Sequence, residues 1–280
     1  MALLAGGCDR MVVLNPKGPI ADAERGLLFD AFSVMMLVIV PVIVMAFWFA
    51  WRYRASNRAV RYGPKWAEST LIDSIVWLIP AAIVIAVAVL VWLSTHKLDP
   101  YRPIASDVPP LDIQVVGQDW KWLFIYPEQG IASVNQMAIP AGRPISLRIT
   151  SDTVMNSFYV PALAGQIYAM AGMQTRLQML ANQPGKFVGR NTQYSGGGFS
   201  DQFFEVLATT PAEFDAWVAK AKQSPDKLDP PTYAKLAVRS RNVPFTYYST
   251  VEPRLFDSII AKYSHAHRMP EPAAPAPARR

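Results

Sequence analysis

Cysteine is almost absent from this 280-residue chain, which contains a single thiol at Cys8. One cysteine excludes an internal disulfide framework, a zinc site that needs two thiolates, and an iron–sulfur cluster built from this chain alone. Charged residues are also few, at 17%, against 51% hydrophobic residues. This balance is too apolar for an ordinary soluble domain and too polar for a transporter with many spans. It predicts a membrane anchor joined to a water-exposed domain.

The net charge of +6 is spread along the chain, since residues 1–30 sum to −1, residues 52–73 to +3 and residues 97–280 to +4. No segment has the character of a basic nucleic-acid-binding face, so we expect no nucleic-acid partner. The sequence also lacks a Ser–His–Asp set, a phosphate-binding loop and a dinucleotide fingerprint. We therefore predict no catalytic residues in this chain.

Two long runs without a charged residue stand in the first third of the chain, at residues 31–51 and 74–95. Each is long enough to cross a hydrocarbon core of about 30 Å at a rise of about 1.5 Å per residue. We predict a transmembrane hairpin over residues 27–97, with spans at about 29–51 and 73–95.

The connection between the predicted spans, residues 52–70, is strongly basic. Its only acid is Glu68, and its cations are Arg52, Arg54, Arg58, Arg61 and Lys65. The positive-inside rule places this loop in the cytoplasm, so both termini are expected on the outer side of the membrane.

The first residues, MALLAGGC, resemble the end of a bacterial lipoprotein signal, in which small residues precede an acylated cysteine. Cys8 is therefore predicted to carry lipid, and residues 1–26 form a signal-like N-terminal segment. Ala5 stands where leucine is usual, and no basic start precedes the apolar run. An unmodified thiol is the alternative.

A water-exposed domain begins at Leu111, after a linker rich in proline and polar residues. The segments LDIQVVGQDW, WLFIYP, ISLRITS and FEVLATT have strand length and are rich in β-branched and aromatic residues. Proline and glycine turn signals separate them. This pattern predicts a β-sandwich or Greek-key barrel over residues 111–210.

From Pro211 the apolar pattern becomes helical, because Phe214, Trp217, Val218 and Ala221 share one face of PAEFDAWVAKAKQ. We predict a C-terminal helical and aromatic-rich extension over residues 211–265 that packs on the sandwich. Residues 266–280 are rich in proline and alanine, and we predict a disordered tail there.

The order of motifs along the chain resembles subunit II of the haem–copper respiratory oxidases, and within them the ubiquinol oxidase branch of the cytochrome bo type. The resemblance rests on the two spans with their basic loop and then on DWKWLFIYPEQGIASVN, VMNSFYVP, QIYAMAGMQTRL and YSGGGFSDQFF. It covers nearly the whole chain. It implies a cupredoxin-like fold for the outer domain, which would face the periplasm from a bacterial inner membrane.

In the cytochrome c oxidase branch this domain holds a dinuclear copper centre built from thiolates, imidazoles and a thioether, which are ligands that copper prefers. The resemblance carries the ligand positions over to Asn156, Tyr194, Gly196, Gly198, Gln202 and Glu205. None of these residues supplies a thiolate, an imidazole or a thioether. We therefore expect no copper centre in this chain, and no other metal site.

The resemblance implies an accessory, non-redox subunit of a proton-pumping ubiquinol oxidase, which oxidises quinol and reduces dioxygen to water. Haems, copper and ubiquinol are then expected in subunit I, the main partner, with subunits III and IV and membrane lipids as further partners. No docking of cytochrome c is expected. Asp73 stands where the family has a glutamate at the mouth of a proton path into subunit I, and a simple interfacial acid is the alternative.

A different hypothesis is a free, membrane-tethered copper chaperone or ligand-binding module. It would use the methionines of the outer domain, namely Met155, Met170, Met173 and Met179. Methionines next to aromatic residues, without histidine or cysteine partners, are more typical of core packing. A chaperone would bind copper in isolation, whereas an oxidase subunit would be found with haem-bearing partners.

Overall fold

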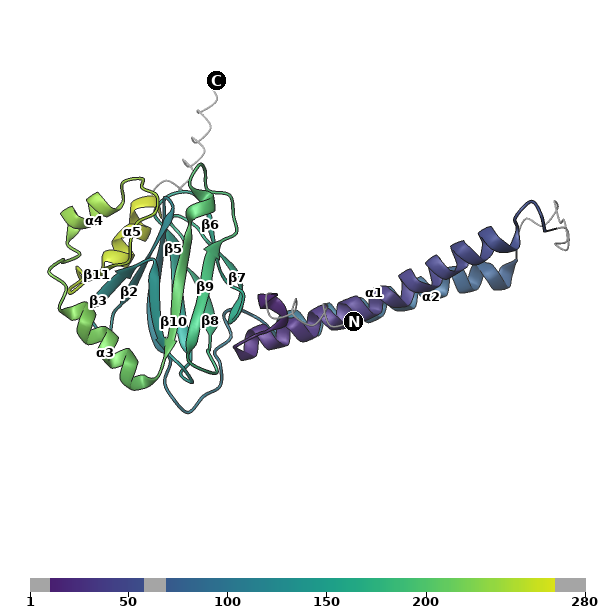
Figure 1. Ribbon diagram of the computed structural model, residues 1–280, viewed down its shortest axis with the longest axis horizontal. Coiled ribbons are helices and arrows are strands. Elements are labelled where there is room, and N and C mark those ends of the chain that lie inside the picture. Colours follow the sequence, from purple (N-terminus) through teal and green to yellow (C-terminus); the bar gives the residue numbers. More distant parts are fainter. Residues whose placement is uncertain (1–10, 58–68, 265–280) are drawn as a thin grey trace, which may run out of the picture. The chain divides into compact units, whose positions relative to one another are not determined.

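In the computed structural model the described residues are 11–57 and 69–264 (Figure 1). They belong to two compact units, of which one is Ala23–Asp99 and the other comprises the residues on either side of it in the sequence. Cys8, most of the basic loop and the tail 266–280 lie outside the described residues. The chain leaves the larger unit at Asp22 and rejoins it at Pro100.

Two long apolar helices, α1 (Pro19–Arg52) and α2 (Thr70–Lys97), form a hairpin. Both are long and apolar enough to cross a membrane, and almost none of their side chains is buried. This confirms the two predicted apolar helices. Pro41 and Pro80 lie inside them, which a bilayer helix tolerates when neighbouring groups satisfy the freed carbonyls.

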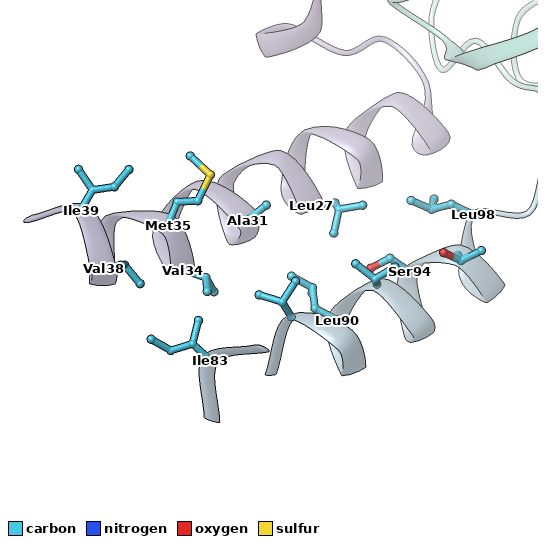
Figure 2. Close-up of a pocket in the computed structure, with 13 residues that line it drawn as sticks. Leu27, Ala31, Val34, Met35, Val38, Ile39, Ile83, Leu90, Ser94 and Leu98 are labelled. Atoms are coloured by element: carbon cyan, nitrogen blue, oxygen red, sulfur yellow. The ribbon is translucent and has the colours of Figure 1, made fainter. Parts of the chain in front are cut away.

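An open groove of about 680 Å³ lies between the two helices. Figure 2 shows Val34 and Val38 of α1 turned toward Ile83 and Leu90 of α2. The groove's walls are apolar along most of their length, and Ser94 and Thr95 are the hydroxyl-bearing residues that line it. The hairpin therefore presents hydrocarbon surface between its helices as well as around them.

The larger unit is built on two β-sheets packed face to face, which confirms the predicted sandwich. One sheet has the strand order β11-β3-β2-β1-β5-β8. Its strands are β1 (Leu111–Gln118), β2 (Lys121–Tyr126), β3 (Ile131–Val134), β5 (Ile145–Ser151), β8 (Thr175–Met179) and β11 (Thr246–Tyr248). The other sheet has the order β4-β10-β9-β6-β7. Its strands are β4 (Gln136–Pro140), β6 (Asn156–Val160), β7 (Ala164–Ala169), β9 (Gly185–Asn191) and β10 (Phe203–Thr209).

Buried and partly exposed residues alternate along β10 of the second sheet, and this pattern explains how the core forms. In β10 every second residue from Phe204 is buried, as expected for a strand with one face on the core. The buried rings of Trp122, Phe158 and Phe204 meet between the sheets, with centroids 5.4 Å apart for Trp122–Phe158 and 4.9 Å apart for Phe158–Phe204. Aromatic contacts at this spacing stabilise the packing beyond the area that they bury.

Helix α3 (Pro211–Lys222) extends the same core. Thr210 caps its start, because the Thr210 hydroxyl accepts the Glu213 N–H and the Glu213 carboxylate accepts the Thr210 N–H. The Thr210 hydroxyl also donates to this carboxylate, and the two hydrogen bonds from Thr210 lower the pKa of Glu213. Four side chains of α3 join the main core, and they are the predicted ones: Phe214, Trp217, Val218 and Ala221.

The rest of the C-terminal extension covers the outer face of the first sheet. Helices α4 (Pro230–Leu236) and α5 (Leu255–Ser264) lie there, and Phe256 and Ile259 of α5 pack on apolar residues of β1, β2 and β3. This second core explains why all six residues of β2 are buried. A strand covered on both faces has a continuous apolar run in place of an alternating one.

The segment before α1 is packed against the sandwich. The Lys17 N–H donates to the Ala162 carbonyl at 2.7 Å, and the Asn182 N–H donates to the Lys17 carbonyl at 2.9 Å. Gly18 is buried so tightly that a Cβ there would lie 2.3 Å from the Leu180 carbonyl oxygen. Only glycine fits that position, and the first turn of α1 continues the contact through Ile20 and the buried Ala21.

Candidate functional site

Three buried amide side chains meet at one end of the sandwich. Asn156 begins β6, Asn191 ends β9, and Gln202 immediately precedes β10. Since these neighbouring strands are antiparallel, their three residues come to the same edge of the sheet. The Asn191 Nδ2 donates to the Asn156 Oδ1 at 2.8 Å and to the Gln202 Oε1 at 2.9 Å, and the Gln202 Nε2 donates to the Asn156 Oδ1 at 3.0 Å.

Ser195 joins this group, because its hydroxyl donates to the Gln202 Oε1 at 2.8 Å. We call Asn156, Asn191, Ser195 and Gln202 the amide cluster. The remaining amide atoms also have partners: the Asn156 Nδ2 donates to the Val154 carbonyl at 2.9 Å, and the Gln202 Nε2 donates to the Gln118 carbonyl at 3.2 Å. The Asn191 Oδ1 accepts two backbone N–H groups. A buried polar network is stable when its members are satisfied in this way.

The chemistry of the amide cluster does not fit a dinuclear copper centre. Its donors are amides and a hydroxyl, whereas such a centre needs soft thiolates together with imidazoles. The lone pairs that face the cluster already accept hydrogen bonds within it. Across the described ranges 11–57 and 69–264, no group of three or more His, Cys, Asp or Glu residues comes together.

The structure brings together two of the six predicted ligand positions, Asn156 and Gln202. Tyr194 is 72% exposed, and its ring faces Phe199. Glu205 lies on β10, where its Oε1 accepts the Gln136 Nε2 at 2.9 Å.

Gly196 and Gly198 pack against Trp120 and not against the amide cluster. A Cβ at Gly198 would lie 2.2 Å from the indole ring, so this close approach requires glycine. The glycine run thus serves the packing of Trp120.

Asn191 was missed from the sequence. A polar residue that ends a strand just before a glycine-rich loop was its only signal, and many such residues face solvent.

Asp73 lies in the first turn of α2, is exposed, and donates its N–H to the Ser69 carbonyl at 2.9 Å. A carboxylate there interacts favourably with the helix dipole, which is compatible with either predicted role.

Comparison with known proteins places these features in a family. Residues 129–206 match the family described as cytochrome c oxidase subunit II, periplasmic domain, and residues 222–267 match the family described as COX aromatic rich motif. The cytochrome bo(3) ubiquinol oxidase subunit 2 of Pseudomonas aeruginosa is 52% identical over 94% of this chain and 80% of its own length. The chain belongs to the ubiquinol oxidase subunit 2 family.

Further relatives agree. The ubiquinol oxidase subunit 2 of Acetobacter aceti is 48% identical over 94% of this chain and 86% of its own length. The quinol oxidase subunit 2 of Bacillus cereus is 37% identical over 84% of this chain and 82% of its own length. Among solved structures, the periplasmic domain of cytochrome oxidase subunit II from Bradyrhizobium japonicum is 25% identical, covers 44% of this chain and 98% of its own, and has a TM-score of 0.40.

Family membership confirms several predictions. The chain is a subunit of a haem–copper oxidase complex, an oxidoreductase that uses ubiquinol, and subunit I is implied as a partner. Its β-sandwich domain is cupredoxin-like and follows two apolar helices that are long enough to cross a membrane, which fits a membrane-anchored subunit.

Proposed function

We propose that this chain is the non-redox subunit II of a proton-pumping ubiquinol oxidase and that it supports the assembly and stability of subunit I. The observation that carries this proposal is the closed amide cluster. It occupies the end of the sandwich to which two predicted copper-ligand positions, Asn156 and Gln202, come. Amide groups that already hydrogen-bond one another do not offer their oxygens to a metal ion.

The redox chemistry then belongs to other subunits. Ubiquinol is oxidised, and dioxygen is reduced to water, at haems and copper in subunit I, and no cytochrome c docks on this chain. The role of this chain is to cover and shape subunit I from the membrane and from the outer side. Its two helices support this role, because their apolar side chains and the groove between them need lipid or protein contacts (Figure 2).

The topology follows from the charge of the connection between the helices. Its excess of arginine and lysine favours the cytoplasmic side of a bacterial inner membrane, with both termini and the sandwich in the periplasm. Subunits III and IV and membrane lipids complete the expected contacts.

Purification through a tag on this chain, in mild detergent, tests the function. A reduced-minus-oxidised spectrum, a metal count and quinol-dependent oxygen uptake are measured on the product. We expect haem, copper and oxidase activity to co-purify, and copper to be absent from the chain once it is separated from subunit I. A haem-free lone chain would refute the proposal, and copper bound to that lone chain would favour the chaperone hypothesis.

Lipid attachment to Cys8 is a separate prediction. Replacing Cys8 with Ser removes the thiol that a diacylglyceryl group needs, so incorporation of a labelled fatty acid into this chain should fall to background. Mass spectrometry of the N-terminal peptide is the second measurement. Labelling that persists in the variant would rule out Cys8 as the acceptor.

Asp73 gives a prediction about proton uptake. If its carboxylate guards a proton path, Asp73→Asn should slow ubiquinol-dependent oxygen uptake several-fold in a complex with full haem content. Asp107→Asn, at an exposed acid in the linker before β1, is the control for loss of one charge. Normal turnover of the Asp73 variant would leave only the interfacial role.

A further inference from the structure

A short segment of the C-terminal extension, Val238–Val243, lies across the turn that joins β1 to β2. We call this segment the strap. The Arg239 Nε donates to the Asp119 Oδ2 at 2.6 Å. The Lys121 Nζ donates to the Val238 carbonyl at 2.8 Å and to the Ser240 hydroxyl at 2.7 Å. The residues on either side of Trp120 in the turn are thus both bonded to the strap.

Trp120 itself is held between the strap and the glycine-rich loop. The guanidinium carbon of Arg241 stands 5.1 Å from the centroid of its indole ring, at cation–π distance. On the side of the loop, the indole N–H donates to the Ser195 carbonyl at 3.2 Å, and Gly198 approaches the ring closely. Ser195 belongs to the amide cluster, so Trp120 connects the strap to that cluster.

The backbone of Trp120 is strained. Its φ is +67°, in the left-handed region that a bulky side chain seldom occupies. Such a conformation is unfavourable and persists only when the surroundings fix it from several sides. Here the strap and the glycine-rich loop supply those constraints.

Two further hydrogen bonds, both made by Asn135, connect the strap to the start of β2. The Asn135 Nδ2 donates to the Val243 carbonyl at 2.9 Å, while the Asn135 Oδ1 accepts the Trp122 N–H at 2.9 Å. Lys121 is fully buried, and its burial lowers its pKa. The Val238 carbonyl and the Ser240 hydroxyl of the strap accept hydrogen bonds from this buried ammonium.

We propose that the strap holds the Asp119–Lys121 turn in its strained conformation. Through Trp120, it also keeps the glycine-rich loop and the amide cluster in one ordered state. This inference rests on the proposed function, in which the loop binds no metal and so has no bound group to order it. The strap supplies that order from the C-terminal extension. When the strap opens, Trp120 should relax out of its left-handed conformation, and residues 194–198 should become mobile.

The test uses the intact oxidase complex purified through this chain. In the variant Arg239→Ala/Arg241→Ala the strap loses its ion pair to Asp119 and its contact with Trp120. The matched control is Lys227→Ala/Lys235→Ala, which removes two cations from the same extension away from the turn. Hydroxyl-radical footprinting measures oxidation of Trp120, and hydrogen–deuterium exchange measures the peptide that spans the glycine-rich loop.

We expect a several-fold rise in Trp120 oxidation and in loop exchange for the strap variant, and no change for the control. Trp122 is fully buried and lies two residues away, so its unchanged oxidation shows that the sandwich is still folded. Wild-type values for both Trp120 and the loop, while the strap itself exchanges faster, would overturn the proposal.

If the double variant unfolds, Arg241→Lys decides the question. This variant keeps the charge and loses the planar group that lies over the indole. A smaller rise in Trp120 oxidation supports the proposal, and wild-type oxidation in that variant would overturn it.

Discussion

Replacing Asp152 with Ala should lower the free energy of unfolding of the β-sandwich domain by about 2–4 kcal/mol and release the C-terminal extension first. Asp152 is buried between the sandwich and the extension, where its Oδ2 accepts the Tyr233 hydroxyl and its Oδ1 accepts the Lys262 Nζ at 2.8 Å. A hydrogen bond to a charged group contributes about 1.5–3 kcal/mol, and a solvent-exposed ion pair about 0–1 kcal/mol. The Tyr233 bond therefore dominates the loss.

Pulse proteolysis of the purified complex in urea measures this change, with cleavage sites in residues 230–264 expected to open first. Asp215→Asn, at an exposed acid of α3, is the control. Asp152→Asn keeps an acceptor for Tyr233 and should lose less. A wild-type midpoint for Asp152→Ala would show that the apolar contacts of α5 hold the extension without this carboxylate.

The same contact gives a pH dependence. The hydrogen bond to Asp152 raises the pKa of Lys262 above its ordinary value of 10.5. A raised pKa means that the folded state favours the protonated lysine, so this contribution is fully present below about pH 10.5 and is lost as the pH rises through the raised pKa. Between pH 9 and 12 the wild type should lose stability relative to Asp152→Ala, and parallel curves would contradict the pairing.

Replacing Gln202 with Leu should lower the free energy of unfolding by about 2–4 kcal/mol. Leucine has a similar size but leaves the Ser195 hydroxyl without its acceptor, the Gln202 Oε1, and the Gln118 carbonyl without the Gln202 Nε2 donor. A buried polar group without a partner costs about 1–3 kcal/mol. Gln183→Leu, at an exposed position between β8 and β9, is the control.

The double variant Asn156→Leu/Gln202→Leu makes this prediction sharper. The two residues share a hydrogen bond, so their effects should not add, and the coupling free energy is expected at about 0.5–3 kcal/mol. Urea unfolding, followed by pulse proteolysis, is measured for the wild type, the two single variants and the double variant, which together form a double-mutant cycle. Additive losses would mean that the amide cluster is not a connected network.

Much of the fold could be predicted from the sequence because the decisive signals are local. Two uncharged runs long enough to span a bilayer indicate α1 and α2, and apolar spacing in α3 indicates its buried face. The change of the apolar pattern at Pro211 marks where α3 begins. Such signals depend on residues a few positions apart, so no knowledge of the tertiary structure is needed.

The amide cluster could be predicted only in part. Family resemblance carried over positions for Asn156 and Gln202, but it could not indicate that Asn191 completes their hydrogen bonds from a third strand. The contacts of Lys121 with the strap were beyond sequence reasoning, because they join residues 117 and 119 positions apart through hydrogen bonds. Long-range polar contacts leave no periodic pattern.

The close packing of Gly18 against the sandwich determines where the chain tolerates an insertion. The sandwich binds the chain on both sides of the hairpin, at Lys17–Gly18 and through the Gln178 N–H, which donates to the Pro100 carbonyl at 3.2 Å. The segment before α1 and the segment after α2 are thus each fixed to the sandwich by contacts of their own. An affinity tag or reporter inserted between residues 52 and 70 would lengthen the connection between the helices and leave both sets of contacts intact, since the cost of loop closure grows slowly with length. The same insertion between Gly18 and Ala21 would break the contacts before α1.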